Sequence, residues 1–542
     1  MSGLFDPDGA RGALVRRWYA EGYYGSATFP ETMAAGHEQF KHHRTVFYSG
    51  SGIRELTADE LYGRARSLAG ALYDLGIRPG DVVAIQVPNW VEGNLMFQAA
   101  MLLGAVVLPV IHIYGPAEVS YILEESGARM LVMPDRWRNI DYLERLRAIE
   151  RPASLEHVVI IGEAPEGAVG WDALAASSDP GFPEPELDPD DVALMVFTSG
   201  TTSAPKGVLH SHNSLHAELR ASRGQGDGDD GTPVVLSPWP AGHIAGVLGI
   251  LRLYFTGAES VLMDAWNAEA AASLIERYRV TSSSGTPYFI NSLLDAADAG
   301  GYDISSLTNY LLGAASVPAE VVERCERRGI VTYRSYGSTE HPTISGGEPA
   351  QPLEKRINTD GTLLPGCAVR IVDDDGEDLP PGREGEILSI GPDQFLGYRQ
   401  REFNADAFDA RGWFRTGDIG RLDEAGYLTI TDRKKDIIIR GGENIASKEV
   451  EDLLITHPSV QEVAVTAMPD ARLGEKVCAY VIVQPGAALS LEDVQAHFAS
   501  RQVARQKTPE RLEVVADLPR TASGKVKKFE LRARLESAQE KA

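Results

Sequence analysis

The sequence predicts an α/β protein with largely parallel sheets and more than one domain. Up to about Arg370, apolar strand-like runs alternate with helical patterns, which is typical of parallel strands connected by helices. Beyond Arg370 the pattern changes to short strands separated by Asp/Gly turns. The length of 542 residues exceeds the size at which single hydrophobic cores stop growing, so two or more domains are expected.

Hydrophobic periodicity locates the individual elements of the first part. Strands are expected at residues 82–87, 105–110, 157–162, 192–197, 260–264 and 279–281, and helical segments at 61–75 and 121–125.

The second part is expected to be rich in β-hairpins, because Asp/Gly turns at 372–377 and 423–427 separate its strands. After Asp432 a compact α+β pattern follows. It comprises a strand, a helix at 447–454, strands at 463–467 and 477–483, a helix at 491–499 and a basic tail. The Gly/Asp-rich stretch 224–231 is expected to be a surface loop.

Composition narrows the classes of function. The formal net charge of −25 argues against general binding of nucleic acid or anionic membranes, although local sites for ATP or CoA remain compatible with it. Three widely spaced cysteines (Cys325, Cys367, Cys478) indicate reduced thiols. The sequence shows neither a signal peptide nor an apolar run long enough to cross a membrane, so we expect a cytoplasmic protein.

The segment from Phe197 to Val208 carries the clearest chemical signal. It follows an apolar strand pattern and combines five hydroxyl side chains, two glycines and one lysine: Thr198, Ser199, Thr201, Thr202, Ser203, Gly200, Gly207 and Lys206. Hydroxyls, closely approaching backbone N–H groups and a lysine are what a polyphosphate requires from a loop. The spacing is not that of a Walker A motif. The alternative interpretation, a solvated Ser/Thr turn, does not account for the whole combination.

This segment closely resembles the phosphate-binding motif of the adenylate-forming superfamily, which includes acyl-CoA synthetases, adenylation domains of peptide synthetases and beetle luciferases. Further motifs resemble those of the superfamily in the same order, from about Glu55 to the end of the chain. They are Gly313-Ala-Ala315, Tyr336-Gly-Ser-Thr-Glu340, Gly385-Glu-Ile387, Thr416-Gly-Asp418, Asp432-Arg-Lys-Lys-Asp436, Gly441-Gly-Glu-Asn444 and Pro519-Arg-Thr-Ala-Ser-Gly-Lys525.

The resemblance implies an architecture and an activity. Residues 1–432 would form an N-terminal adenylation domain with two doubly wound sheets and a β-barrel subdomain, and residues 433–542 a small mobile C-terminal domain. The activity would be that of an AMP-forming acid:CoA ligase. A carboxylic acid and ATP give an acyl-adenylate and pyrophosphate, and CoA then gives the thioester and AMP. ATP, Mg²⁺ and CoA are therefore the expected cofactor and co-substrates.

The resemblance also assigns the nucleotide-binding residues. Phosphate contacts fall to Thr198, Ser199, Gly200, Thr201, Thr202 and Lys206, and adenine contacts to Gly313, Ala314, Ala315 and Tyr336, with Gly337, Ser338 and Thr339 completing the second motif. Asp418 and Arg433 would bind the ribose. Glu340 would bind Mg²⁺ with help from Thr201, because this ion takes most of its ligands from phosphates and water.

Catalysis would depend on Lys525, supported by Lys206, Thr198 and Glu340. An ammonium group suits the charge that moves between the carboxylate and the α-phosphate in the transition state. The superfamily then rotates its small domain about a hinge residue, here Lys435. Gly441, Gly442 and Glu443 would line the pantetheine tunnel after that rotation.

The acid substrate is less defined. His243, Ile244 and Val247 lie where the acyl pocket of the superfamily begins, and the segment is apolar. It carries no carboxylate to pair with an amino group, which disfavours an amino-acid substrate. The segments Gly242-His-Ile-Ala-Gly246 and 433–445 resemble those of short- or medium-chain and alicyclic CoA ligases. This resemblance implies a short- or medium-chain fatty acid or an alicyclic acid as the substrate. A carrier protein as acceptor and an inactive nucleotide-binding scaffold are the alternatives. Ser203 occupies a position where most relatives have glycine, and the sequence leaves a homo-oligomer open.

Overall fold

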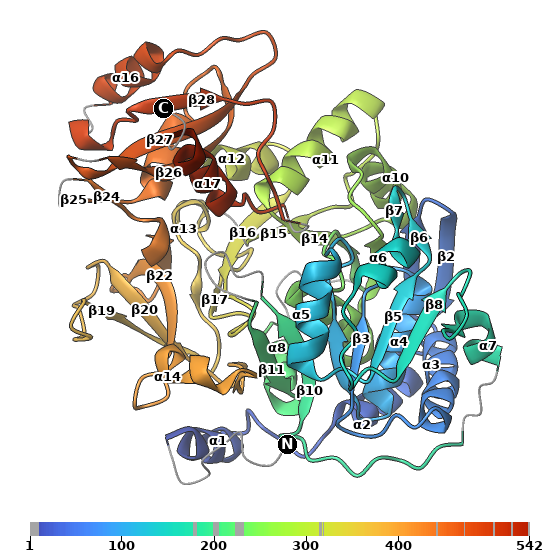
Figure 1. Cartoon of the computed structure of the whole chain (residues 1–542). Helices are drawn as coiled ribbons and strands as arrows, with labels where there is room; N and C mark the ends of the chain where they lie inside the picture. Colours follow the sequence, from blue (N-terminus) through green and yellow to red (C-terminus); the bar gives the residue numbers. More distant parts are fainter. Residues whose placement is uncertain are drawn as a thin grey trace.

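The computed structural model describes residues 10–176, 181–198, 205–222, 232–313, 317, 319–440, 443–470, 472–501, 504–521 and 524–539. Figure 1 shows a large N-terminal part with two β-sheets and their helices, a smaller sheet beside it, and a C-terminal part at the top of the view. The predicted α/β architecture of a large and a small domain is confirmed.

The first sheet has eight strands and contains the predicted phosphate-binding hairpin. Its order is β21 (Gly397–Tyr398), β11 (Gly207–Ser211), β10 (Val192–Phe197), β4 (Val106–Pro109), β3 (Val82–Ile85), β5 (Met130–Pro134), β8 (His157–Ile161) and β9 (Val169–Gly170). The strands from β10 to β9 are parallel, whereas β11 and β21 pair in antiparallel fashion at one edge.

The second sheet has nine strands with a parallel centre. Its order is β18 (Thr362–Leu363), β17 (Ser345–Gly346), β16 (Val331–Tyr336), β15 (Asn309–Leu312), β14 (Ser282–Gly285), β12 (Val234–Ser237), β13 (Glu259–Met263), β1 (Arg44–Ser49) and β2 (Gly52–Thr57). The strands predicted in the first part are present, with one correction. The strand predicted at 279–281 begins only at Ser282, because Arg279 takes the left-handed conformation (φ 51°) that ends the preceding helix.

Helices fill the space between these sheets and cover their outer faces. The helices of this part are α1 (Ala10–Ala20), α2 (Phe29–Phe40), α3 (Ala58–Asp74), α4 (Val91–Leu102), α5 (Pro116–Ser126), α6 (Tyr142–Ala148), α7 (Trp171–Ala176), α8 (His212–Ala221), α9 (Ile244–Thr256), α10 (Ala268–Tyr278), α11 (Pro287–Gly300), α12 (Ala319–Glu326), α13 (Leu353–Asn358) and α14 (Asn404–Ala407). Every residue of α4 except Glu92 is buried. Its core cluster joins Val83 of the first sheet to Leu262 of the second. A helix in such a position is expected to be mostly apolar, and its buried Asn94 and Gln98 hydrogen-bond to each other.

The predicted hairpin region forms a four-stranded antiparallel sheet. It consists of β19 (Ala368–Val372), β20 (Gly385–Ile390), β22 (Phe414–Leu422) and β23 (Leu428–Arg433). The two predicted turns close as expected: Asp373 N–H donates to the Glu377 carbonyl, and Asp423 N–H donates to the Tyr427 carbonyl. A bridge between Thr362 and Tyr427 connects this sheet to the edge of the nine-stranded sheet, at the place where the barrel subdomain was expected.

The C-terminal part is the predicted α+β unit. Its sheet contains β25 (Glu443–Ile445), β24 (Ile438–Arg440), β27 (Gly474–Val483), β26 (Val460–Asp470) and β28 (Arg511–Val514), and its helices are α15 (Ser447–Leu454), α16 (Leu491–Ser500) and α17 (Lys528–Gln539). Short elements complete the chain: β6 (Arg136–Trp137), β7 (Ile140–Asp141), η1 (Arg401–Phe403), η2 (Lys434–Asp436) and η3 (Arg505–Lys507).

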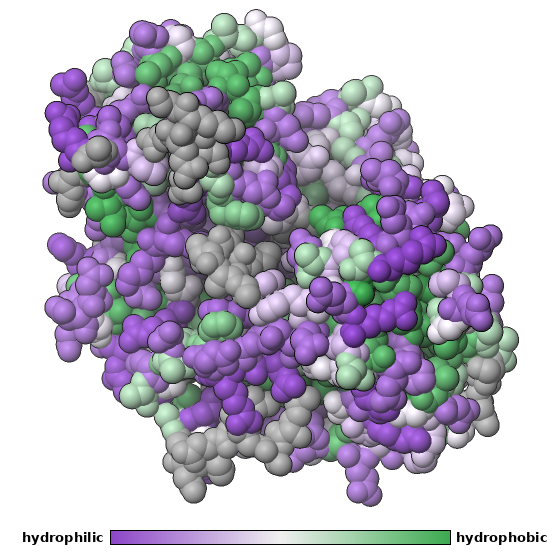
Figure 2. Space-filling model, viewed as in Figure 1, coloured by the Kyte–Doolittle hydropathy of each residue, from purple (hydrophilic) through white to green (hydrophobic). Residues whose placement is uncertain are grey.

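The outer surface is predominantly polar. Figure 2 shows hydrophilic residues over most of one face, with hydrophobic residues gathered on the C-terminal part and scattered elsewhere. Among the described residues, no helix combines the length and apolar character needed to cross a membrane. The loop predicted at 224–231 lies outside the described residues.

The packing of α2 against α9 requires a glycine, which gives a test of the fold. A Cβ atom on Gly36 would lie 2.1 Å from the Tyr254 carbonyl oxygen, whereas a Cβ atom on Gly63 in α3 would meet nothing within 4 Å. We expect Gly36→Ala to lower the stability by about 1–3 kcal/mol, since overpacked sites cost that much. Gly63→Ala should be neutral or stabilising by up to about 1 kcal/mol. Thermal unfolding of both variants measures this contrast, and equal melting temperatures would contradict the packing.

Candidate active site

Asp418 is the centre of the candidate nucleotide site. It lies in β22, directly opposite Arg433 in β23, and is 5% exposed. The hydroxyl of Tyr336, at the end of β16, donates to its Oδ2 at 2.7 Å. Arg433 Nε lies 3.1 Å from Oδ1. Both carboxylate oxygens are therefore engaged, as a buried charge requires.

The charge of Asp418 shapes its neighbours. It is the main cause of a raised pKa for the half-exposed Arg433. Burial, and next Asp418, hold the pKa of Tyr336 well above its ordinary value, so this hydroxyl remains a donor. A carboxylate fixed in this way can still accept hydrogen bonds from a diol, because each oxygen has more than one acceptor position.

Glu340 follows β16 in a loop that several segments hold in place. Its Oε1 accepts a hydrogen bond from the Tyr398 hydroxyl of β21 at 2.8 Å. His210 of β11 donates from Nε2 to the carbonyl of the preceding residue, Thr339, at 2.8 Å. The turn depends on Gly337, since a Cβ atom there would lie 2.0 Å from the Pro342 carbonyl oxygen. The loop is thus fixed through both its backbone and its carboxylate.

The predicted phosphate loop is the connection between β10 and β11. Thr198 N–H donates to the Lys206 carbonyl at 3.0 Å, which closes the base of this connection. The Lys206 ammonium lies 4.8 Å from the ring centroid of Tyr398 and 4.7 Å from that of Phe403. Because Tyr398 also contacts Glu340, Lys206 and Glu340 approach the same aromatic side chain. The loop residues Ser199, Gly200, Thr201, Thr202 and Ser203 lie outside the described residues.

Lys525 reaches this region from the C-terminal part. Its loop is closed by Thr521, whose N–H donates to the Lys525 carbonyl at 2.8 Å and whose Oγ1 accepts the Lys525 N–H at 3.1 Å. Gly524 adopts φ +81°, and a Cβ atom there would lie 3.0 Å from Oγ1 of Thr286, the N-cap of α11. The loop therefore rests directly on the N-terminal part.

Electrostatic contacts place Lys525 beside the nucleotide-site residues. Burial, and next the positive charge of Arg433, lower the pKa of Lys525 to about 8. The negative charges of Asp418 and Glu340 raise this pKa. A lysine that interacts with all three of these groups joins the C-terminal part to the site formed by the N-terminal sheets.

The predicted acyl-pocket residues lie at the start of α9. His243 caps this helix, accepting the Ala245 N–H at Nδ1 (3.3 Å), and its ring stacks on Trp239 with centroids 5.3 Å apart. Burial, and next the charge of Lys525, lower the pKa of His243 to about 3, so the imidazole is neutral. Ile244 and Val247 are buried in the core between the two sheets. His243 thus connects this core to the Lys525 region.

The remaining predicted residues occupy the ends of β15 and the start of the C-terminal part. Gly313 N–H donates to the Gly285 carbonyl at 3.2 Å, while Ala314 and Ala315 lie outside the described residues. Lys435 lies in η2, and its carbonyl accepts from Arg532 of α17 at 2.9 Å. Glu443 is exposed and pairs with Arg440 across the hairpin whose turn residues, Gly441 and Gly442, also lie outside the described residues.

Sequence reasoning missed the residues that support Glu340. Tyr398 and His210 contact the Glu340 loop from strands that are distant in sequence. Tyr398 follows a glycine in an apolar run, and His210 directly follows two apolar residues in β11. Neither pattern differs from that of an ordinary buried strand, so the sequence contains no signal that would have singled them out.

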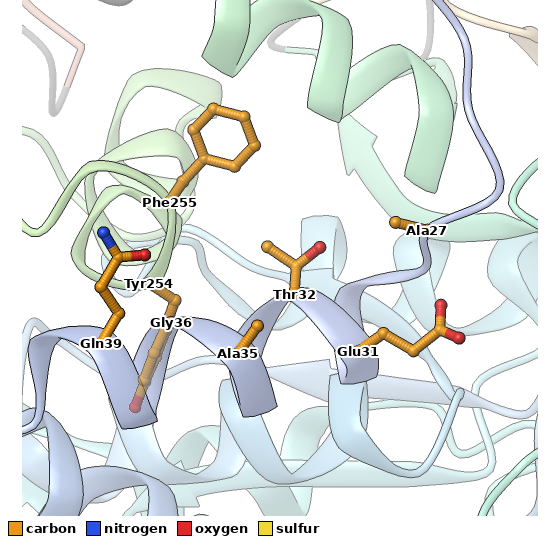
Figure 3. Close-up of a pocket in the computed structure, with 8 residues that line it drawn as sticks. All are labelled: Ala27, Glu31, Thr32, Ala35, Gly36, Gln39, Tyr254 and Phe255. Atoms are coloured by element: carbon orange, nitrogen blue, oxygen red, sulfur yellow. The ribbon is translucent and has the colours of Figure 1, made fainter.

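A separate cavity of about 380 Å³ lies between α2 and α9. Figure 3 shows Thr32, Ala35 and Gly36 of α2 opposite Tyr254 and Phe255 of α9. None of the predicted site residues lines it. We therefore locate the candidate active site at the Asp418, Glu340 and Lys525 cluster rather than at this cavity.

Comparison with known proteins identifies the family of the chain. Residues 34–399 match the model of the AMP-binding enzyme family, and residues 449–525 match that of the AMP-binding enzyme C-terminal domain. The chain belongs to the AMP-binding enzyme family, as its motifs predicted.

Individual relatives span nearly the whole chain. The medium-chain fatty-acid–CoA ligase of Escherichia coli (strain K12) is 38% identical over 86% of this chain and 84% of its own length. The 2,3-dihydroxybenzoate-AMP ligase of Bacillus subtilis (strain 168) is 33% identical over 87% of this chain and 88% of its own length. Among solved structures, the anthranilate CoA ligase AuaEII in complex with anthranoyl-AMP superposes with a TM-score of 0.84 at 25% identity, covering 95% of this chain and 98% of that one.

Proposed function

We propose that this protein is an AMP-forming acid:CoA ligase. It activates a carboxylic acid with ATP to an acyl-adenylate, releases pyrophosphate, and transfers the acyl group to CoA with release of AMP. The observation that carries the proposal is that the charges of Arg433, Asp418 and Glu340 all act on Lys525, whose loop rests on the N-terminal part at Thr286. A cation from the C-terminal part among acidic and basic groups suits a reaction that redistributes charge around a phosphate.

Each of these groups has a role in the first half-reaction. Asp418 accepts hydrogen bonds from the ribose hydroxyls, Arg433 adds a second ribose contact, and Tyr336 borders the adenine. Lys525 stabilises the negative charge shared by the attacking carboxylate and the α-phosphate. Lys206 and Thr198 belong to the loop that positions the phosphates. Because little covalent chemistry falls to the protein, alignment and charge neutralisation account for the rate.

Glu340 suits the role of a magnesium-binding residue. One of its oxygens accepts from Tyr398, and the carboxylate keeps a second oxygen for a hard cation. Together with the Thr201 hydroxyl it would hold Mg²⁺, which neutralises phosphate charge. The fixed loop around Glu340 keeps this carboxylate in place before the nucleotide binds.

The second half-reaction requires a different placement of the C-terminal domain, residues 433–542. In the present arrangement Lys525 occupies the site, and Figure 1 shows β24 and β25 at the outer edge of the C-terminal part, away from α11 and β14. The two strands on either side of Gly441 and Gly442 in the sequence therefore lie away from the proposed adenylate site. Rotation about Lys435 would withdraw Lys525 and bring this hairpin to the site, where it would line the path of the CoA thiol.

A short- or medium-chain fatty acid or an alicyclic acid is the proposed substrate. The start of α9 is apolar, and His243, with its pKa near 3, presents a neutral ring. The name of the Escherichia coli relative agrees with a medium-chain acid. The name of the Bacillus subtilis relative, an AMP ligase for 2,3-dihydroxybenzoate, favours a second candidate, an aryl acid that is activated as an adenylate.

Pyrophosphate release with ATP and Mg²⁺ tests the proposal directly. The assay uses short, medium and long fatty acids together with cyclohexane, aromatic and sterol side-chain carboxylates, each with and without CoA. We expect acid-dependent release that turns over repeatedly only when CoA is present. Turnover without CoA consumption would select the other-acceptor candidate, and ATP binding without release for any acid would select an inactive scaffold.

The ionisation of Lys525 predicts a pH dependence of adenylation. The ammonium form, which stabilises the transition state, is present below the pKa of about 8 and is lost above it. We expect kcat/KM for ATP in pyrophosphate release to fall about tenfold per pH unit on the alkaline side, since this parameter reports the free enzyme. Lys525→Arg keeps its charge and should lose that alkaline limb. Lys525→Ala should lower the rate by about 10²–10³, and an unchanged rate would exclude the mechanism.

The docking of the Lys525 loop gives a second test. Gly524 and Gly486 share nearly the same left-handed backbone (φ +81° and +79°), but only Gly524 faces a neighbour. Alanine at either position costs about 1–2 kcal/mol for its backbone conformation. Only Gly524→Ala should also slow pyrophosphate release, because its methyl group would press on Thr286. Equal activity of the two variants would show that the loop position does not matter for the reaction.

A further inference from the structure

Behind the Glu340 loop, three metal-ligating side chains come together from distant segments. His341 follows Glu340, Cys367 precedes β19, and Asp393 lies between β20 and β21. Their donor atoms all lie within 4.8 Å of one another. His341 is 0% and Asp393 1% exposed, and Cys367 is partly buried. None of them has a part in the proposed ligase reaction.

The distances within this cluster suit a tetrahedral metal ion. His341 Nε2 lies 3.1 Å from Asp393 Oδ1 and 3.5 Å from Cys367 Sγ, and Sγ lies 3.3 Å from the same Oδ1. Zinc bonds of about 2.3 Å to sulfur and about 2.0–2.2 Å to nitrogen and oxygen give tetrahedron edges of about 3.4–3.6 Å. Each observed separation is within about 0.3 Å of that range, so modest side-chain adjustments would complete the geometry.

The surroundings of the three donors resemble those of a metal centre. His341 Nδ1 lies 2.9 Å from the Ser389 hydroxyl. A partner of this kind on the second ring nitrogen fixes the orientation of a ligating histidine. Asp393 Oδ2 accepts the Thr343 N–H at 3.4 Å, which leaves Oδ1 for the cluster. Two of the three ligands are therefore already oriented by neighbouring groups.

A glycine lies directly against the three donors. A Cβ atom on Gly391 would lie 2.7 Å from Cys367 Sγ, 2.7 Å from His341 Nε2 and 3.0 Å from Asp393 Oδ1. Any larger residue would therefore intrude among the three donor atoms. The donors can come together here only because residue 391 carries no side chain.

A buried carboxyl group beside the cluster offers a further donor. Glu218 of α8 is 1% exposed, and its Oε1 accepts from the Thr343 hydroxyl at 2.9 Å. Thr343 also donates its N–H to Asp393, so Glu218 and the cluster share this neighbour. Within the described part of the chain, Oε2 of Glu218 has no hydrogen-bond partner. A buried polar atom without a partner is costly, and a metal ion would supply one.

We propose that His341, Cys367 and Asp393 bind a structural Zn²⁺ ion, with Glu218 as a further donor. A thiolate, an imidazole and a carboxylate form a borderline-soft ligand set that selects Zn²⁺ over Mg²⁺. Binding displaces the proton of the Cys367 thiol into solvent. The ion connects the loop that carries Glu340 to the segments that flank β19 and β20. This site is distinct from the magnesium position, which involves hard oxygen donors.

Metal analysis of the full-length chain, without a histidine tag, tests the site. The protein is produced in zinc-supplemented medium and dialysed against EDTA to remove surface metal. We expect about one zinc per chain, because a buried structural ion exchanges slowly. Cys367→Ala should lower the zinc content severalfold. Cys325→Ala and Cys478→Ala, which remove buried thiols elsewhere, should leave it unchanged.

A second measurement keeps the test decisive if Cys367→Ala does not fold. The wild-type chain is produced with cobalt in place of zinc, and its spectrum is examined for a thiolate-to-cobalt charge-transfer band. We expect this band to be present in Cys325→Ala and Cys478→Ala as well. A zinc-free wild type without the band, or a Cys367→Ala variant that retains full zinc, would overturn the proposal and identify the cluster as hydrogen-bonded only. Neither readout depends on ligase activity, so the proposed function is tested separately.

Discussion

The candidate site depends on the hydrogen bond and the ion pair that the buried carboxylate of Asp418 forms. This carboxylate accepts the Tyr336 hydroxyl from the nine-stranded sheet and pairs with Arg433 of the adjacent strand. This one charged group therefore joins the nine-stranded sheet to the four-stranded antiparallel sheet. If Asp418 were lost, a buried hydroxyl would be left without its acceptor and a guanidinium without its counter-charge, and both changes are costly. The same carboxylate also raises the pKa of Lys525, whereas Arg433 lowers it.

The junction between the two parts is built from the residues next to Asp418. Arg433 contacts the N-terminal side through Asp418, whereas the preceding residue, Asp432, contacts the C-terminal side. Asp432 accepts the backbone N–H and the hydroxyl of Ser447 at the start of α15. Lys528 of α17 donates to the same hydroxyl at 2.8 Å and pairs with Glu451 at 2.7 Å. The polypeptide thus passes from one part to the other within a single strand.

The short helix η2 contains Lys435, the residue proposed as the hinge. It consists of Lys434–Asp436 and separates β23 from β24. Arg532 holds it on the C-terminal side, through the Lys435 carbonyl and the Asp436 carboxylate. Only a few backbone angles lie between the strand that ends at Arg433 and this anchored turn, and hinge motions concentrate at such element ends.

The sequence by itself determined the class of fold and the identity of most candidate residues. Strands such as Val82–Ile85 and helices such as Ser447–Leu454 were predictable, because their hydrophobic pattern is local. The strand at Ser282 was placed too early, since the run Arg279-Val-Thr281 resembles the start of a strand, whereas the backbone of Arg279 ends a helix. Asp418, Glu340 and Lys525 were found through motifs, which encode local geometry as well as chemistry.

Only the tertiary structure decided which side chains meet. Tyr398 beside Glu340, His341 beside Cys367 and Asp393, and Gly524 against Thr286 all join residues far apart in the chain. Their positions follow from how sheets and helices pack, and periodicity within one segment carries no information about that packing. The sequence therefore specified the chemical groups and their order, while long-range packing fixed their distances, partners and ionisation.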